Sequence, residues 1–266
     1  MNTPISFSIE EVRDYILDKL NNNKEFFFFN ELELQIFVAR ELEKVFKAGY
    51  KVHLEYQLPK GWNPIFDEGY QRWGTEKPYF DIVIEHENQF IAIELKYKLK
   101  EIRLRPEERF LRFGEKANDK NLILVTNQSA ENEGRYDFWK DVKRIEILSK
   151  AFDNVIGGIA ILVTNQENYK NSNENLKYSN FNLSDSKNGF LYWNIKNEQV
   201  REGIPSGEKL KDNKSQKTNW GQEWEHWVRP NFTLEGEYKD LEWSNYEGPL
   251  KENFYFYSVV IPKYSK

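Results

Sequence analysis

The segment from Tyr79 to Tyr97 constrains the fold most, because two apolar runs there flank a short polar break at residues 86–88. Short runs rich in β-branched and aromatic residues, separated by turn-forming residues, predict the two strands of a β-hairpin. With residues 87 and 88 as a two-residue turn, partner numbers add up to 175, so Asp81 is expected opposite Glu94. The sequence therefore places two carboxylates side by side in an apolar hairpin.

Two facing carboxylates need a compensating positive group. Opposed Cβ atoms in an antiparallel pair lie roughly 4.5–5.5 Å apart, and like charges that close are destabilising unless a cation lies between them. Side chains alternate along a strand, so Lys96 is expected on the face of Glu94. The opposite face is expected to carry the apolar residues Ile91, Ile93 and Leu95. The alternative is a cross-strand salt bridge on an exposed face, for which the segment is too apolar.

Capping signals and apolar spacing predict the elements around this hairpin. Asn30 with Glu33 is typical of a helix start, and a continuous apolar run at residues 157–164 is typical of a buried strand. The expected elements are helices at 9–20 and 30–46, strands at 51–58, 79–85, 89–97 and 122–126, a helix at 136–148 and a strand at 157–164. They predict an α/β fold with a mixed central sheet flanked by helices.

Composition changes along the chain suggest three parts. Residues 165–182 hold seven asparagines and little hydrophobic pattern, whereas short aromatic strands such as 254–261 follow. The expected parts are an N-terminal helix and linker at 1–29, a core at 30–166, and a β-rich aromatic C-terminal extension at 167–266 packed on the core.

The residue types exclude several kinds of site. The chain has no cysteine and only three scattered histidines, which excludes disulfides and thiolate sites and argues against zinc. Any metal would be held by oxygen. No run approaches the roughly 18–20 apolar residues that cross a bilayer, and the N-terminus resembles no signal peptide. We expect a cytoplasmic protein with no membrane partner.

A basic segment follows the hairpin. The chain carries a net charge of −5, but residues 96–120 hold nine basic and five acidic residues, a balance of +4 against −9 elsewhere. Its position after the second strand suggests contacts to nucleic-acid phosphates, although a solvated surface is the common alternative. The candidate contact residues are Lys98, Lys100, Arg103 and Arg105.

Glu31 is a further candidate on the second helix. It falls near the middle of an apolar arc, where a carboxylate is costly unless it is paired or binds a metal. The arc consists of Leu34, Val38, Leu42 and Val45. An ordinary first-turn carboxylate favoured by the helix dipole is the alternative. Glu33 fits the capping box instead.

These features together resemble the PD-(D/E)xK superfamily, which includes restriction endonucleases and many repair nucleases. Asp81, twelve residues and then Glu94-Leu95-Lys96 match its motif on a hairpin, after a helix that bears Glu31. The short motif is weakly specific, and the αβββαβ order over residues 30–164 strengthens it. Pro78 precedes Asp81 by three positions, which departs from the literal Pro-Asp pair. The resemblance implies a restriction-endonuclease-like core.

The resemblance also implies a mechanism. Asp81 and Glu94, assisted by Glu31, would bind Mg²⁺ or, as a substitute, Mn²⁺, while Lys96 would position and help deprotonate the attacking water. The chain would then be a DNA endonuclease, of the restriction or phage-defence kind, acting on double-stranded DNA. Such enzymes commonly act as homodimers. The alternatives are a non-cutting nucleic-acid-binding module or assembly subunit that keeps the fold, and a toxin-like RNA nuclease.

Several other residues stay open between site and surface. Glu55 on the first strand, and Asp141, Arg144 and Glu146 on the third helix, fit a place near the site or ordinary strand and helix surface positions; for the helix, ion pairs are favoured. The tryptophans of the C-terminal part fit a core better than a base-stacking platform. They are Trp220, Trp224 and Trp227, with Lys214, Lys217 and Arg229 nearby.

Overall fold

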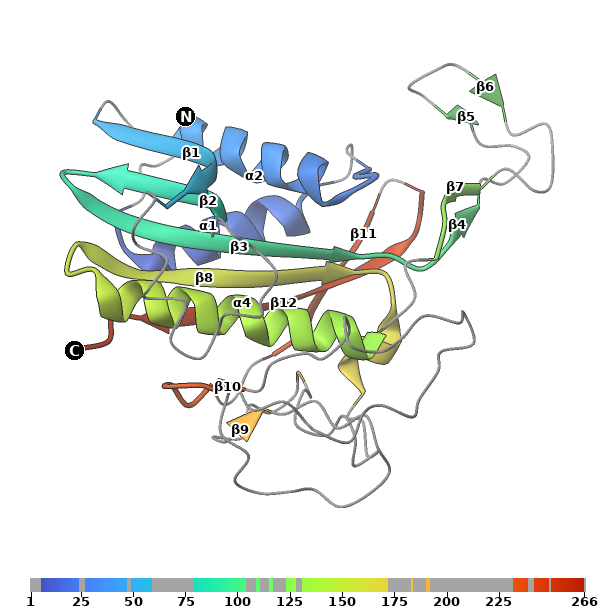
Figure 1. Ribbon diagram of the computed structural model, residues 1–266. Coiled ribbons are helices and arrows are strands. Elements are labelled where there is room, and N and C mark those ends of the chain that lie inside the picture. Colours follow the sequence, from blue (N-terminus) through green and yellow to red (C-terminus); the bar gives the residue numbers. More distant parts are fainter. Residues whose placement is uncertain are drawn as a thin grey trace.

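The structure is a computed structural model of the chain, and one mixed six-stranded sheet forms its centre (Figure 1). The described residues are 6–23, 27–46, 49–58, 79–103, 109–110, 115–116, 123–127, 131–171, 183, 190–191, 232–238, 242–248 and 250–265. The sheet has the order β1-β2-β3-β8-β12-β11, in which β3 and β8 are parallel and every other pair is antiparallel. The α/β class and the mixed sheet are therefore confirmed.

The strands of this sheet are β1 (Tyr50–Gln57), β2 (Tyr79–His86), β3 (Gln89–Lys98), β8 (Val155–Thr164), β11 (Ser244–Glu247) and β12 (Asn253–Pro262). Short ladders outside it join β4 (Ile102–Arg103) to β7 (Ile123–Val125), β5 (Arg109–Phe110) to β6 (Glu115–Lys116), and β9 (Phe190–Leu191) to β10 (Phe232–Thr233). A 3₁₀ helix, η1, spans Glu167–Lys170. The strand expected at 122–126 thus pairs outside the central sheet.

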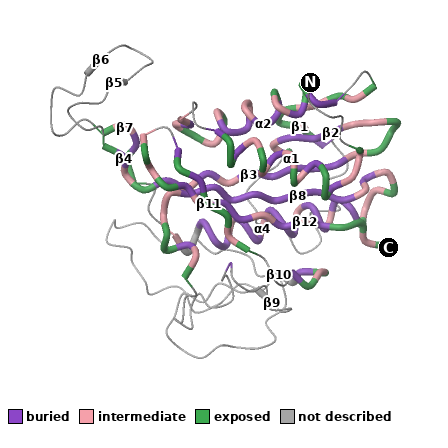
Figure 2. The backbone as a smooth tube through the Cα atoms, turned by 180° about the vertical axis from the view of Figure 1, so that it is seen from behind, coloured by how far each residue is buried: buried purple, intermediate pink, exposed green. Residues whose placement is uncertain are grey.

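Helices cover both faces of the sheet. The helices α1 (Ile9–Asn21) and α2 (Glu31–Val45) pack on one face, and α4 (Glu131–Ala151) packs on the other (Figure 1). The alternation of β3 follows this division, because Ile91, Ile93 and Leu95 belong to the core under α1 and α2, whereas Ala92 belongs to the core under α4. Figure 2 shows the central strands buried between the two helical layers.

The first two helices begin where the capping signals predict. The Ser8 hydroxyl accepts a hydrogen bond from the Glu11 N–H at 3.2 Å, and the Asn30 side chain accepts one from the Glu33 N–H at 2.9 Å. The Glu33 carboxylate in turn accepts from the Phe29 N–H, which makes it a capping residue as expected.

The hairpin has the predicted register. Glu87 and Asn88 both have positive φ, at 46° and 63°, as the central residues of a type I′ turn require. Ile82 lies opposite Ile93 and His86 opposite Gln89, so partner numbers add up to 175. The described β2–β3 ladder ends at the Ile82–Ile93 pair, so the expected pair of Asp81 with Glu94 is not part of it.

The last two strands continue the central sheet. In β12, Tyr255 pairs with Thr164 and Pro262 with Gly157, so β12 covers the edge of β8 along its length. β8 is buried, so the backbone N–H and C=O groups along both of its edges need hydrogen-bond partners other than water. Strands of the expected C-terminal extension therefore complete the sheet.

Within the described ranges, no helix is long and apolar enough to cross a lipid bilayer.

The helix expected at 136–148 is longer in the structure, where α4 spans Glu131–Ala151. The additional residues at its two ends are mostly polar and carry no apolar period, so the sequence pattern did not predict them. The helix expected at 30–46 closely matches α2.

The turn gives a first prediction. Asn88→Val places a β-branched side chain at positive φ and should lower the free energy of unfolding by about 1–3 kcal/mol, measured by urea denaturation. The matched control is Gln89→Val at the next position, which is exposed and begins β3 with ordinary extended φ. Equal losses of stability in both variants would contradict the turn assignment.

Candidate active site between strands β2 and β3

The β2–β3 ladder ends at the Ile82–Ile93 pair, where the two strands part. Past the Ile82–Ile93 pair, β2 stays paired with β1 and β3 stays paired with β8, but the β2–β3 ladder does not continue. Two carboxylates bind the β3 backbone there: Asp81 Oδ2 accepts from the Leu95 N–H at 2.7 Å, and Glu31 Oε2 accepts from the Tyr97 N–H at 2.9 Å. Asp81 and Glu31 therefore take the place of a neighbouring strand.

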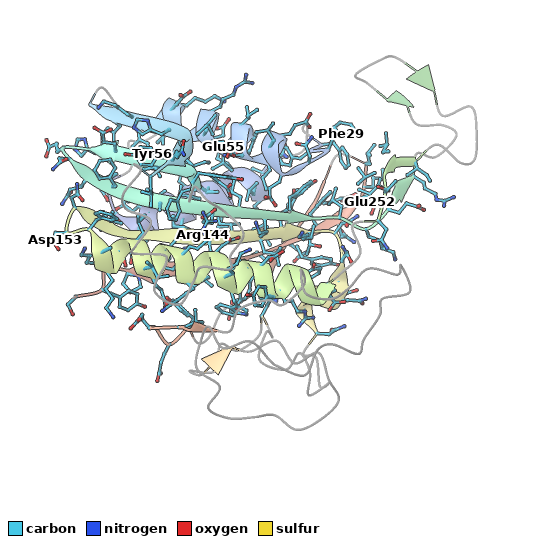
Figure 3. All side chains as sticks on the ribbon, in the orientation of Figure 1. Phe29, Glu55, Tyr56, Arg144, Asp153 and Glu252 are labelled. Atoms are coloured by element: carbon cyan, nitrogen blue, oxygen red, sulfur yellow. The ribbon has the colours of Figure 1, made fainter. Side chains whose placement is uncertain are left out.

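Glu94 points from β3 toward α4. It is 2% exposed, and its Oε1 lies 2.8 Å from Nη1 of Arg144. That contact is an ion pair with poor hydrogen-bond alignment, because Oε1 accepts no well-aligned hydrogen bond within the described residues. Figure 3 labels Arg144 on α4, in front of the sheet. Arg144 is thus the principal cation that balances the charge of this buried carboxylate, and Lys96 contributes less.

Arg144 has three further contacts. Its Nη1 lies 3.4 Å from Oδ1 of Asp141, and its Nη2 donates a hydrogen bond to the carbonyl oxygen of Tyr79. The guanidinium carbon lies 5.0 Å from the ring centroid of Phe80, within the range of a cation–π contact. These contacts link α4 to the first residues of β2.

Lys96 lies between two other carboxylates. Its Nζ is 3.0 Å from Oδ2 of Asp141 and 3.6 Å from Oε1 of Glu31. The lysine side chain is mostly buried, so these contacts form in a region of low dielectric constant. Lys96 thereby connects the N-terminus of α2 to α4.

Burial and charge shift the protonation of these groups. Burial raises the pKa of Asp81 to about 6, although the Leu95 N–H opposes it. Burial also raises the pKa of Glu94 well above its usual range, against the opposing effect of Arg144. For Asp141, burial favours the neutral acid, but Lys96 and Arg144 outweigh it and lower the pKa. For Lys96, burial disfavours the charged form, but Asp141 and Glu31 outweigh it and raise the pKa.

The donor set fits a divalent cation by charge. Four carboxylates, from Glu31, Asp81, Glu94 and Asp141, face two cations, Lys96 and Arg144, which leaves two negative charges uncompensated when all are ionised. Carboxylate oxygens are the donors that Mg²⁺ prefers. Glu94 Oε1 and Asp141 Oδ2 are buried without an aligned hydrogen bond among the described residues.

The side chains are oriented toward protein partners, however. In the part of the chain that the structure describes, no three residues among His, Cys, Asp and Glu form a group that is ready to hold a metal ion. Asp81 faces the Leu95 N–H, Glu94 faces Arg144 and Asp141 faces Lys96. A metal would therefore have to exchange with these contacts.

The candidate DNA-contact residues lie farther along β3. Lys98 is half-buried on β3, two residues beyond Lys96, and Lys100 and Arg103 are exposed. Arg103 pairs with Glu101. Arg105 and the residues around the C-terminal tryptophans (Trp220, Trp224, Trp227, Lys214, Lys217 and Arg229) lie outside the described residues.

Three residues near the site were not assigned to it by sequence. Asp141 and Arg144 form the intrahelical ion pair that the sequence favours, but they are buried and also contact Lys96 and Glu94. Gln35 carried no prediction. Gln35 is 2% exposed and donates to Glu55 Oε1 at 2.9 Å and to the Asp81 carbonyl. The usable signal was a glutamine one turn after Glu31, on the same buried face.

Glu55 and Glu146 have different outcomes. Glu55 (labelled in Figure 3) is exposed with φ of 49°, and it reaches Asp81 only through Gln35. Glu146 points away from the site, where it accepts from the N–H groups of residues 235 and 236 and from the Tyr238 hydroxyl. Glu146 thereby anchors residues 235–238 to α4.

Comparisons with protein-family models, with curated proteins and with solved structures found no match to this chain. Any functional assignment therefore depends on the geometry of the site itself. That geometry consists of buried carboxylates on two neighbouring strands, with a lysine and an arginine among them.

The raised pKa of Asp81 gives a second prediction. The folded state holds the Asp81 proton more tightly than the unfolded state, where the pKa is about 3.9, so without metal this group should stabilise the fold as pH falls through about 6 toward 4. Between pH 7.5 and pH 5, the unfolding free energy of wild type should therefore rise relative to that of Asp81→Asn, measured by urea denaturation with chelator. Asp14→Asn, an exposed carboxylate on α1, is the control. A difference independent of pH would refute the prediction.

Proposed function

We propose that this protein is a Mg²⁺-dependent endonuclease that hydrolyses phosphodiester bonds of DNA, of the kind used in restriction or phage defence. The supporting observation is that Asp81, Glu94 and Lys96 converge at the parting of β2 and β3, with Glu31 beside them. The order α2, β1, β2, β3, α4, β8, with β3 parallel to β8, supports a restriction-endonuclease-like core.

The proposed metal ligands are Asp81 and Glu94, with Glu31 assisting. Both principal ligands have a raised pKa, and a positive charge close to either carboxylate would stabilise its ionised form. Mg²⁺ or Mn²⁺ would supply, when bound, positive charge against the reacting phosphate and a lower pKa for water. The two carboxylates lie on adjacent strands, and Lys96 follows Glu94 by two positions on β3.

Lys96 is proposed to act through its positive charge. Asp141 and Glu31 hold the amine in its protonated form, in which it can act only as a hydrogen-bond donor. A protonated amine orients water and offsets charge that develops on the phosphate. Accepting a proton from water would first require Lys96 to leave Asp141.

The proposed partner is double-stranded DNA. Lys98, Lys100 and Arg103 follow Lys96 along the chain, and the exposure of Lys100 and Arg103 supports contacts to phosphates. A symmetric homodimer would present one such site to each strand of a duplex. The proposed location is the cytoplasm, where such DNA is found.

A non-cutting nucleic-acid-binding module or assembly subunit is the second candidate. It is favoured by one observation: the carboxylates are engaged by Arg144, Lys96 and backbone N–H groups, and no ready metal group exists in the described part of the chain. A fold that uses these contacts only for stability would look the same.

Lys96 and Lys98 separate the two candidates. Lys96→Ala should reduce single-turnover DNA cleavage by about a hundredfold to ten-thousandfold while duplex affinity at fixed salt changes little, because affinity depends on many phosphate contacts. Lys98→Ala, the control on the same strand, should weaken binding modestly and leave the cleavage step intact. Unchanged cleavage by Lys96→Ala, or binding without cleavage by wild type in Mg²⁺, would favour the binding module.

A further inference from the structure

We propose that Arg144 is a built-in counter-ion of Glu94 that a divalent cation must displace before this carboxylate can act as a ligand. The inference rests on the proposed function and concerns how its metal site is regulated. It assigns a role to a residue of α4 outside the proposed ligand set.

The first argument is steric and electrostatic. Nη1 of Arg144 lies 2.8 Å from Oε1 of Glu94. A metal ion bound to that oxygen would therefore lie close to the guanidinium. A guanidinium and a divalent cation repel strongly at such distances when water is excluded, and Glu94 is 2% exposed. The two cations therefore compete for one oxygen.

The second argument is that Arg144 is able to leave. Its contact with Glu94 is not an aligned hydrogen bond, and its side chain is 16% exposed, so part of it already meets solvent. Asp141 also contacts Nη1, while the Tyr79 carbonyl accepts from Nη2 and the Phe80 ring lies near the guanidinium carbon. These contacts would retain Arg144 beside the site after Glu94 is released.

The third argument is the cost of removing Arg144 without a metal. Glu94 would then be a buried carboxylate without its principal cation, which is strongly destabilising. Its proton affinity is already raised by burial despite Arg144. Arg144 thus stabilises the metal-free fold and at the same time weakens metal binding.

The test is calorimetric titration of the full-length protein with Mn²⁺. Arg144→Gln should bind Mn²⁺ about tenfold more tightly than wild type, the lower end of couplings between close charge pairs. The matched control is Lys140→Gln on the same helix, which removes a positive charge near Asp141 without contacting Glu94. Its affinity should change by less than about threefold, because a charge that is not in contact is screened.

Each outcome bears on the proposal. Tighter binding by Arg144→Gln alone supports it, since mere structural damage would weaken binding. Equal or weaker binding by Arg144→Gln, or equal tightening in Lys140→Gln, overturns displacement and leaves the metal site standing. Absence of Mn²⁺ binding in wild type and Arg144→Gln overturns both the inference and the proposed function. If Arg144→Gln does not fold, Arg144→Met, which also removes the charge but keeps an apolar stem beside the Phe80 ring, must bind Mn²⁺ more tightly than wild type, and equal affinity refutes the proposal.

Discussion

The parting of β2 and β3 is the constraint on which the rest of the site depends. A continuous ladder would satisfy the N–H groups of Leu95 and Tyr97 with a neighbouring backbone, but Asp81 and Glu31 satisfy them with side-chain carboxylates instead. Buried N–H groups need such partners. The cost is that negative charge collects in a region of low dielectric constant, where only nearby cations can balance it.

That charge explains the role of α4. Asp141 and Arg144 lie one turn apart on the face of α4 that packs against β3, and together they pair with Lys96 and Glu94. Asp141 contacts both Lys96 and Arg144, and Arg144 also contacts Glu94, so removing one partner changes the charge balance of the others and the network is coupled. The same groups that stabilise the metal-free fold therefore set how readily the proposed metal site opens.

Local patterns were sufficient for the hairpin but not for the network. The turn at Glu87 and Asn88 fixed the register, and strand alternation placed Glu94 and Lys96 on one face, because both depend on neighbours in the chain. The rotation of α4 against the sheet depends on distant packing, so Asp141 and Arg144 resembled a surface ion pair. The pairing of β12 with β8 could not be predicted from local sequence patterns either, because 88 residues separate Thr164 from Asn253 in the chain.

The central claim is that the buried carboxylates bind Mg²⁺ for phosphodiester hydrolysis. The most direct measurement is incubation of purified protein with supercoiled plasmid in Mg²⁺ and in chelator, with wild type beside Glu94→Gln, which removes one ligand charge and keeps the side-chain size. The account predicts nicked or linear plasmid with wild type in Mg²⁺ only, and intact plasmid with Glu94→Gln. Cleavage in chelator, or equal cleavage by Glu94→Gln, would contradict it.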